Sequence, residues 1–246
     1  MKLPAGHRFI HFERIDSTNA EARRLAEAGE CGPLWIWSDE QTGGRGRLGR
    51  TWVSEPGNLY ATFLFQTVAP VQAIAQISFV AAVAVHELAS HLLPKESFLL
   101  KWPNDVLMNG AKCCGLLAEV VGVEPTRISL GCGINLAHAP SGTPYPAAAL
   151  GGEFTPEQVL PGLASSLWKW IEVWDGGGGF PAIRKSWLES AAGVGKEISV
   201  DGMKGRFEGL GPDGALLMTL GDGTTKHIHA GDVRFADIER MRSGKI

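Results

Sequence analysis

The segment Gly43–Arg50, which reads GGRGRLGR, constrains the fold most strongly because its glycines suggest a nucleotide-binding turn that the neighbouring residues exclude. From Gly44 it matches the pattern G-x-G-x-x-G, but in a dinucleotide-binding fold these glycines lead directly into a helix that holds the pyrophosphate. Here a turn at Glu55–Asn58 comes next, then a strand-like run, and the G-K-[ST] of a P-loop is absent. Both nucleotide-binding folds are therefore excluded. What remains is a glycine-rich loop that can wrap an anion with backbone N–H and guanidinium groups; on the segment alone, a solvated surface loop is the alternative.

The overall charge makes this loop more informative. The chain has 246 residues, 44% of them apolar and 20% charged, which is typical of a soluble globular protein. Its formal net charge is −3, so the chain as a whole does not attract nucleic acid, and an anion must be bound locally. A nucleic-acid-binding module built on the basic loop is a weaker alternative for the same reason.

The sequence predicts neither export nor insertion into a membrane. Residues Met1–His11 lack the apolar core of a leader, and polar side chains interrupt the apolar run Val71–Leu93, which predicts a buried helix. No C-x-x-C spacing occurs among the four cysteines, which are Cys31, Cys113, Cys114 and Cys132. We therefore expect a cytoplasmic protein with reduced thiols and no membrane partner.

Hydrophobic periodicity and turn residues predict an alternation of strands and helices. We expect strands at Phe9–Arg14, Leu34–Ser38, Asn58–Thr67, Ser97–Trp102, Val106–Met108, Lys112–Val121 and Arg127–Asn135. We expect helices at Ala20–Ala28, Val71–Leu93 and Ala182–Ala192, and a helical region that opens at Thr155-Pro156. Thr18 and Glu21 resemble a capping box, Pro161 should interrupt or kink its helix, and Asn109-Gly110 is a strong hairpin signal. Residues 136–153 are rich in Pro, Gly and Ala, and this composition predicts a loop.

The pattern changes at Gly195. From there, short strand-like runs are separated by Asp201-Gly202, by residues 211–214 and by residues 221–223. This even spacing predicts a small antiparallel barrel of about fifty residues. We therefore divide the chain into a larger domain, residues 1–193, and a small C-terminal domain, residues 194–246.

Five segments, taken in order, resemble the biotin–protein ligases. They are 16–19 (DSTN), 40–47 (EQTGGRGR), 101–105 (KWPND), 112–119 (KCCGLLAE) and 131–135 (GCGIN). The resemblance is to the short form without an N-terminal DNA-binding domain, because only about eight residues precede the first predicted strand, and no DNA partner is expected. It implies an α+β fold with a central mixed or antiparallel sheet flanked by helices, as in class II synthetases and biotin–lipoate ligases. It also implies a small C-terminal SH3-like β-barrel.

The resemblance also implies a reaction. Members of this family join biotin to ATP, releasing pyrophosphate and forming biotinyl-5′-AMP. They then transfer the biotin to a specific lysine of a biotin carboxyl carrier protein or domain of a biotin-dependent carboxylase. In the first step an anionic carboxylate meets an anionic phosphate, so preorganised cations should lower the barrier. The expected substrates are biotin and ATP, with Mg²⁺ accompanying ATP; the oligomeric state, a homodimer included, stays open.

The resemblance assigns roles to individual residues. Lys112 and Arg47 are the expected catalytic residues, with the Lys112 ammonium bridging the biotin carboxylate and the α-phosphate. The expected biotin-binding residues are Ser17, Thr18, Asn19, Gln41, Arg45, Gly46, Arg47, Lys112 and Gly115. The expected ATP-binding residues are Arg45, Arg47, Arg50, Trp52, Asn104, Lys112 and Asn135, and Asp105 is a candidate Mg²⁺ ligand. Without the resemblance, residues 17–19 would be a helix cap and Lys112 a surface lysine beside a turn.

Two other functions fit the same residues. One is a lipoate or octanoate ligase on a related fold, against which the GRGR and KWPND segments favour biotin. The other is a non-catalytic biotin-binding protein, against which Arg45, Arg47 and Lys112 argue. The chain departs from the family at Cys113, Cys114 and Cys132, where apolar or small residues are usual. We expect these cysteines to be small buried hydrophobes without a redox role.

Overall fold

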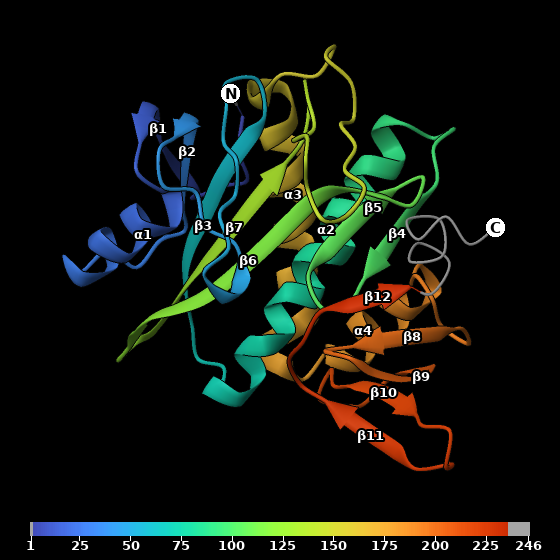
Figure 1. The fold of residues 1–246 in the computed structure, drawn as a ribbon. Coiled ribbons are helices and arrows are strands. Elements are labelled where there is room, and N and C mark those ends of the chain that lie inside the picture. The colour runs from blue at the N-terminus through green and yellow to red at the C-terminus, as the bar shows by residue number, and fades with distance from the viewer. Residues whose placement is uncertain (1, 236–246) are drawn as a thin grey trace.

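The computed structural model describes residues 2–235, which form two β-sheets with helices packed against them (Figure 1). The larger sheet has seven strands in the order β1-β2-β3-β7-β6-β5-β4. They are β1 (Arg8–Ile15), β2 (Leu34–Gln41), β3 (Leu59–Thr67), β4 (Phe98–Lys101), β5 (Asp105–Met108), β6 (Ala111–Val123) and β7 (Thr126–Ile134). Strands β1 and β2 are parallel and every other neighbouring pair is antiparallel, so the expected mixed sheet is confirmed.

Helices cover both faces of this sheet. They are α1 (Thr18–Glu27), α2 (Ile77–Leu92), α3 (Pro156–Trp174) and α4 (Phe180–Glu189), with 3-10 turns at Arg47–Gly49, Val71–Gln76 and Asp175–Gly177. Alternation along β2 divides the two faces: Trp35 and Trp37 join the main core with α2 and α3, whereas Leu34 and Ile36 pack with α1. The stretch Val71–Leu92 has the length and composition of a membrane span, but it is mostly buried inside the protein.

Turn chemistry places the hairpin of β5 and β6 where the sequence predicts it. Asn109 and Gly110 have φ of 52° and 81°, the left-handed conformation that a tight two-residue turn requires and that Asn and Gly adopt most easily. The hairpin brings Lys112 at the start of β6 next to Asp105 at the start of β5. Residues 136–153 form no helix or named strand, as expected.

One local prediction about the helices was wrong. The N-cap of α1 is Ser17, whose Oγ accepts a hydrogen bond from the Ala20 backbone N–H, so the predicted capping box of Thr18 and Glu21 does not form. Thr18 is instead the first helical residue. Pro161 does not interrupt α3, which continues through it to Trp174, and the kink that the sequence predicts as the other possibility stays a prediction.

The C-terminal sheet is small and entirely antiparallel. Its strands are β8 (Glu197–Val200), β9 (Met203–Leu210), β10 (Leu216–Thr219), β11 (Thr225–Ile228) and β12 (Val233–Phe235), in the order β11-β10-β9-β8-β12. Residues 236–246 of the predicted C-terminal domain lie outside the described part of the chain. The sheet shares its core with the larger body, since Trp102 Nε1 donates to the Gly214 carbonyl at 3.2 Å and Phe79 lies against Gly214.

Candidate active site

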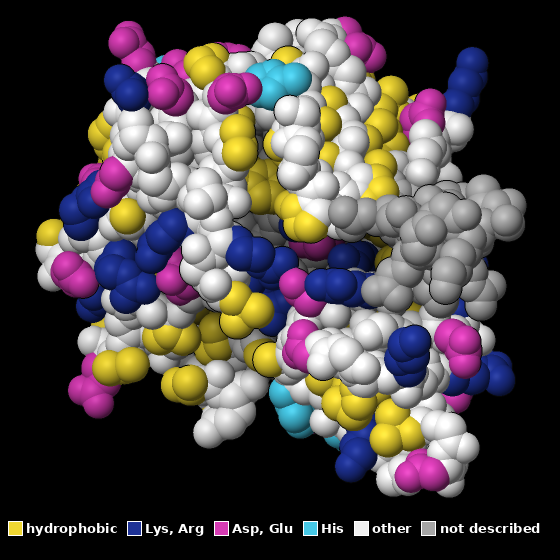
Figure 2. Space-filling view, viewed as in Figure 1, with side chains coloured by type: hydrophobic (Ala, Val, Ile, Leu, Met, Phe, Trp, Pro, Cys, Tyr) yellow, Lys and Arg dark blue, Asp and Glu magenta, His cyan; other side chains and the backbone are white. Residues whose placement is uncertain are grey.

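A cleft of about 330 Å³ lies on the α1 side of the larger sheet. The loop Gly43–Arg50, called the glycine-arginine loop below, contributes Arg45, Gly46, Arg47 and Arg50 to its lining. Figure 2 shows Lys and Arg side chains gathered in the hollow between the larger body and the C-terminal sheet. The predicted site residues that line the cleft are Ser17, Thr18, Asn19, Gln41, Arg45, Gly46, Arg47, Arg50, Trp52, Asn104, Asp105, Lys112 and Gly115. The fold therefore brings together residues from separate stretches of the chain. Asn135 is the one predicted site residue that does not line the cleft.

Glycines form the floor of the cleft. Tyr60, Gly133, Gly115 and Asp105 are in register across β3, β7, β6 and β5, so they lie in one row on the same face of the sheet. A Cβ at Gly133 would lie 2.6 Å from the indole of Trp52, and one at Gly115 would lie 2.7 Å from it. The two glycines thus let Trp52 rest directly on the strands. The resemblance assigns Gly115 to biotin; in this structure its missing side chain makes room for Trp52.

One end of the cleft is a hydrogen-bonded network of uncharged polar side chains. Gln41 Oε1 accepts from the backbone N–H of Thr18 at 2.8 Å and from the Thr18 hydroxyl at 3.1 Å, while Gln41 Nε2 donates to Ser54 Oγ at 2.9 Å. The buried hydroxyl of Thr62 lies 2.8 Å from Thr18 Oγ1 and 2.6 Å from Asn19 Oδ1. Because the polar groups are held by one another, this wall presents a defined set of donors and acceptors to a ligand.

The rest of the cleft is cationic. The three loop arginines have separate partners: Arg45 Nη2 lies 3.5 Å from Glu119 Oε2, Arg47 Nη1 donates to Asn104 Oδ1 at 3.3 Å, and Arg50 forms a two-bond ion pair with Asp232 at 2.7 and 3.1 Å. Arg47 is the most enclosed of the three, and burial lowers the pKa of Arg47. An arginine remains charged even so, because its pKa begins far above neutrality.

Lys112 is the central cation of the cleft. Its Nζ lies 2.7 Å from Asp105 Oδ1, and the two side chains are only 14% and 15% exposed. The same ammonium lies 5.2 Å from the ring centroid of Trp52 and 5.1 Å from that of Tyr145, within the range of cation–π attraction. Lys112 is therefore held in place from three sides, which an ordinary surface lysine beside a turn is not.

The two asparagines differ in their surroundings. The Asn104 side chain lines the cleft and contacts both Arg47 and the carbonyl of Leu116. Asn135 is 2% exposed, and its amide donates to the Ala148 carbonyl at 3.0 Å. It lines only a small cavity of about 40 Å³ beside Trp52 and Lys112. Its contacts anchor the segment 136–153, so the assignment of Asn135 to ATP stays a prediction.

The cysteines have the environment of buried apolar residues. Burial raises the pKa of Cys113 and of Cys132 to about 12 and raises the pKa of Cys114 as well. Because the thiolate is the reactive form, this burial disfavours reaction of the three thiols at neutral pH. Among residues 2–235 there is no group of three His, Cys, Asp or Glu side chains arranged to hold a metal ion.

Sequence reasoning missed several residues of the site. Tyr145 lies in the segment 136–153, for which the sequence predicts only a loop; the backbone of Lys112 pairs with this segment at Pro146 and Ala148. Glu119 ends one of the five segments that carry the resemblance, yet the resemblance assigns it no role. Asp232 carries no local signal, because its partner Arg50 is 182 residues away in the chain.

Comparison with known proteins agrees with this geometry. Residues 11–135 match the Biotin/lipoate A/B protein ligase family. The chain is 39% identical over 221 residues to the biotin–[acetyl-CoA-carboxylase] ligase of Paracoccus denitrificans, an alignment that covers 83% of this chain and 91% of that protein. It is 29% identical over 243 residues to the bifunctional ligase/repressor BirA of Bacillus subtilis, covering 93% and 74% of the two chains.

Comparison with solved structures points to the same kind of protein. The structure of the biotin protein ligase from Aquifex aeolicus in complex with biotin and ATP superposes with a TM-score of 0.80 at 26% identity, covering 93% of this chain and 99% of that one. The match extends beyond residue 135, so it includes the arrangement of the C-terminal sheet. Sequence, cleft and overall fold agree, and the chain belongs to the biotin/lipoate A/B protein ligase family.

Proposed function

We propose that this protein is a biotin–protein ligase. It activates biotin with ATP to biotinyl-5′-AMP and transfers the biotin to a lysine of a biotin carboxyl carrier domain. The observation that carries the proposal is the cleft itself, which holds a wall of uncharged hydrogen-bonding groups and, beside it, a wall of cations formed by Lys112 and the loop arginines. Biotin has a ureido ring at one end and a carboxylate at the other, and its two ends match these two walls.

The donor and acceptor pattern of the polar wall suits a ureido ring. The hydroxyl hydrogen of Thr18 is taken by Gln41 or by Thr62, so Thr18 offers a ligand only an oxygen lone pair. Ser17 Oγ accepts from Ala20, which leaves its own hydroxyl hydrogen to donate, and Gln41 keeps one amide hydrogen after bonding Ser54. A ureido ring has N–H donors and a carbonyl acceptor to pair with these groups. A lipoyl ring or an octanoyl chain has neither.

The cationic end suits the chemistry of the first step. An oxygen of the biotin carboxylate attacks the α-phosphorus of ATP, and pyrophosphate leaves. Lys112, Arg45 and Arg47 can stabilise the negative charge that gathers where the two anions meet, and their positions are already held in the folded protein. The role of each cation, and of Arg50 and Trp52 on the nucleotide side, is part of the proposal.

Mg²⁺ fits this site as a companion of the nucleotide. Proteins usually bind Mg²⁺ through one or two carboxylates together with substrate phosphates. Asp105 lines the cleft and would supply one such carboxylate, although in this structure it pairs with Lys112. The ion would neutralise phosphate charge; the arginines and Lys112 orient the reacting groups.

The second step needs space for a lysine from another protein. A second cavity of about 330 Å³ continues from Lys112 and Asp105 toward β12 and is also lined by Lys101 and Phe235. The acceptor amine can approach the mixed anhydride from this side, attack its carbonyl carbon and displace AMP, with one proton released from the amine. A carboxyl carrier domain is the acceptor we propose.

The test is to incubate the protein with biotin, MgATP and a biotin carboxyl carrier domain and to weigh the carrier. We expect a mass gain of one biotinyl group on one lysine, and no gain when lipoate or octanoate replaces biotin. A carrier domain with that lysine changed to arginine is the matched control. An unchanged carrier mass with biotin would refute the proposed function, and a gain with lipoate alone would assign the chain to the other branch of its family.

A further inference from the structure

Glu119 lies outside the cleft but contacts two residues that line it. Its Oε2 accepts from Asn19 Nδ2 at 3.0 Å and lies 3.5 Å from Arg45 Nη2, and its Oε1 lies 3.4 Å from Arg23 Nη2. The carboxylate is 23% exposed and is carried by β6, the strand that also contributes Gly115 to the floor. All three neighbours are N–H donors, so a carboxylate, which can only accept, satisfies each of them.

The bonds to Glu119 and to the Leu117 carbonyl determine which way the Asn19 amide faces. One N–H of Asn19 donates to the Leu117 carbonyl at 3.3 Å and the other to Glu119, while Asn19 Oδ1 accepts from Thr62. If the amide turned over, its oxygen would face two acceptors, the Leu117 carbonyl and the Glu119 carboxylate. Glu119 therefore helps to hold the Asn19 side chain with its amide oxygen toward Thr62 and the uncharged polar wall of the cleft.

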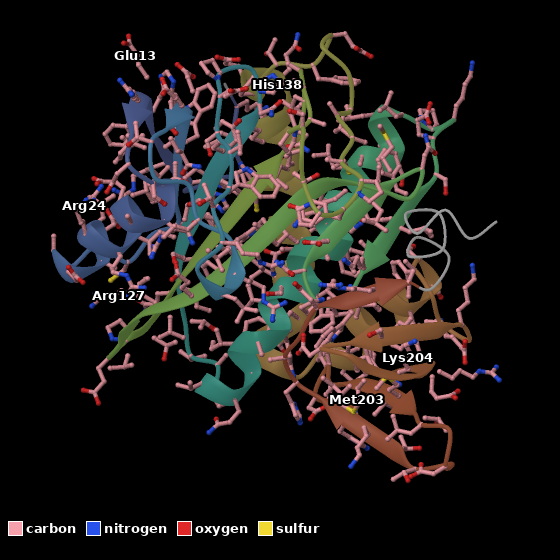
Figure 3. The ribbon with its side chains drawn as sticks, viewed as in Figure 1. Glu13, Arg24, Arg127, His138, Met203 and Lys204 are labelled. Atoms are coloured by element: carbon pink, nitrogen blue, oxygen red, sulfur yellow. The ribbon has the colours of Figure 1, made fainter. Side chains whose placement is uncertain are left out.

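The orientation of the Asn19 amide affects the neighbouring hydroxyl groups of the polar wall. Asn19 Oδ1 takes the single hydroxyl hydrogen of Thr62, so the Thr62 oxygen, 2.8 Å from Thr18 Oγ1, can accept the Thr18 hydroxyl hydrogen, while Gln41 Oε1 accepts from the Thr18 backbone N–H. Helix α1, which carries Thr18 and Asn19, is held on the sheet at its other end, where Arg127 of β7 donates to the Ala26 carbonyl (Figure 3). The backbone is thus anchored independently of Glu119, which leaves the orientation of the Asn19 amide and the contact with Arg45 as the features that depend on Glu119.

We propose that Glu119 is a positioning residue for biotin recognition: by orienting the Asn19 amide it makes the wall of Thr18 and Asn19 present acceptors, which selects a ligand ring that carries N–H groups. This inference rests on the proposed function. A ligand without N–H donors gains nothing from the acceptors, so Glu119 favours a ureido ring over a dithiolane.

Two substitutions separate the hydrogen bond from the charge. Glu119→Leu removes the acceptor, and we expect the biotin KM of pyrophosphate release to rise about tenfold while kcat changes less than about twofold, the size expected for one hydrogen bond to a charged acceptor. The preference for biotin over lipoate should fall as the biotin KM rises.

Glu119→Gln keeps a carbonyl oxygen for Asn19, so its biotin KM should stay within about threefold of wild type. Arg23→Leu removes another partner of Glu119 without touching Asn19 and should leave the KM unchanged.

A double-mutant cycle tests whether Glu119 acts through Asn19. In an Asn19→Ala background, Glu119→Leu should raise the biotin KM no further. Additive effects of the two changes, or a Glu119→Leu enzyme whose melting temperature falls while its biotin KM stays at the wild-type value, would overturn the inference and leave Glu119 a purely structural residue. If the wild-type chain releases no pyrophosphate with biotin and MgATP, the proposed function fails first, and the same variants are then compared by calorimetric titration with biotin.

Discussion

The surroundings of Lys112 in the structure differ from those that its position in the sequence suggests. Along the chain it flanks a hairpin turn, where lysines are usually solvated. In the fold its ammonium is nearly enclosed between Asp105, Trp52 and Tyr145. Removing one member of such a pair leaves the other charge poorly solvated, so Lys112 contributes to stability as well as to chemistry.

At this scale we predict that Lys112→Ala lowers pyrophosphate release on the order of 10²-fold or more, the typical cost of deleting one preorganised charge stabiliser. It should also lower the melting temperature, because Asp105 loses its cation. The double change Lys112→Ala with Asp105→Asn should recover much of the melting temperature but none of the activity. Lys169→Ala, which removes an exposed ion pair with Glu87, is the control for loss of a lysine. Activity within a few-fold of wild type in Lys112→Ala would remove Lys112 from the mechanism.

At the scale of elements, the site depends on close approach between the loop and strands β6 and β7. Gly115 and Gly133 occupy one row of the sheet, and Trp52 lies against both. A side chain at either glycine would lift the indole, and with it the segment next to the arginines. The glycines therefore set the depth of the cleft.

We predict that Gly133→Ala reduces kcat/KM for ATP and biotin by about tenfold or more, because its methyl group would overlap the Trp52 ring and misplace the cleft wall. Its cost in stability should be about 1–3 kcal/mol, as for other overpacked sites. In a Trp52→Ala background the same methyl group has room, so its stability cost should nearly vanish; urea unfolding measures both. Gly152→Ala, where nothing lies within 4 Å of the new methyl group, is the matched control. Equal unfolding midpoints for Gly133→Ala and Gly152→Ala would contradict this role of the floor.

At the scale of the whole molecule, the C-terminal sheet and the larger body are not independent. Buried residues of both belong to one apolar cluster, in which Gly214 of the C-terminal sheet packs against Phe79 and Phe180. The ion pair of Arg50 and Asp232 adds a contact from the loop to the segment before β12. The boundary at residues 193 and 194 remains a prediction about sequence pattern, and the packing argues that the two parts stabilise each other.

We predict that a chain ending at Gly193 loses several kcal/mol of stability in urea unfolding, because it exposes Phe79, Phe180 and Trp102, and burying a large apolar side chain is worth roughly 1.5–3 kcal/mol. It should also bind a hydrophobic dye in its folded state. Asp232→Ala removes only an exposed ion pair and should change the stability by less than about 1 kcal/mol. An unchanged unfolding midpoint in the truncated chain would show that the larger body folds alone.

Local sequence patterns account for the order of the elements and for the hairpin at Asn109-Gly110, and the family resemblance accounts for about half of the residues that line the cleft. Alternation and turn residues predict the elements, and five short segments that resemble one family contain part of the lining, whereas Tyr60 and residues 143–145 lie outside them. These local rules failed where two elements compete for the same side chain. At the N-terminus of α1, Thr18 turns to Gln41 and Ser17 becomes the cap.

The contacts that hold the site residues in place come from the tertiary fold alone. Asn19 and Glu119 are 100 residues apart, and Arg50 and Asp232 are 182 apart, yet each pair lies within hydrogen-bonding distance. No periodicity or spacing predicts such a pair, because contact depends on the register of β6 against β7 and on how the C-terminal sheet packs on the larger body. The chemistry of the cleft is therefore encoded locally, and its geometry is set by packing between distant segments.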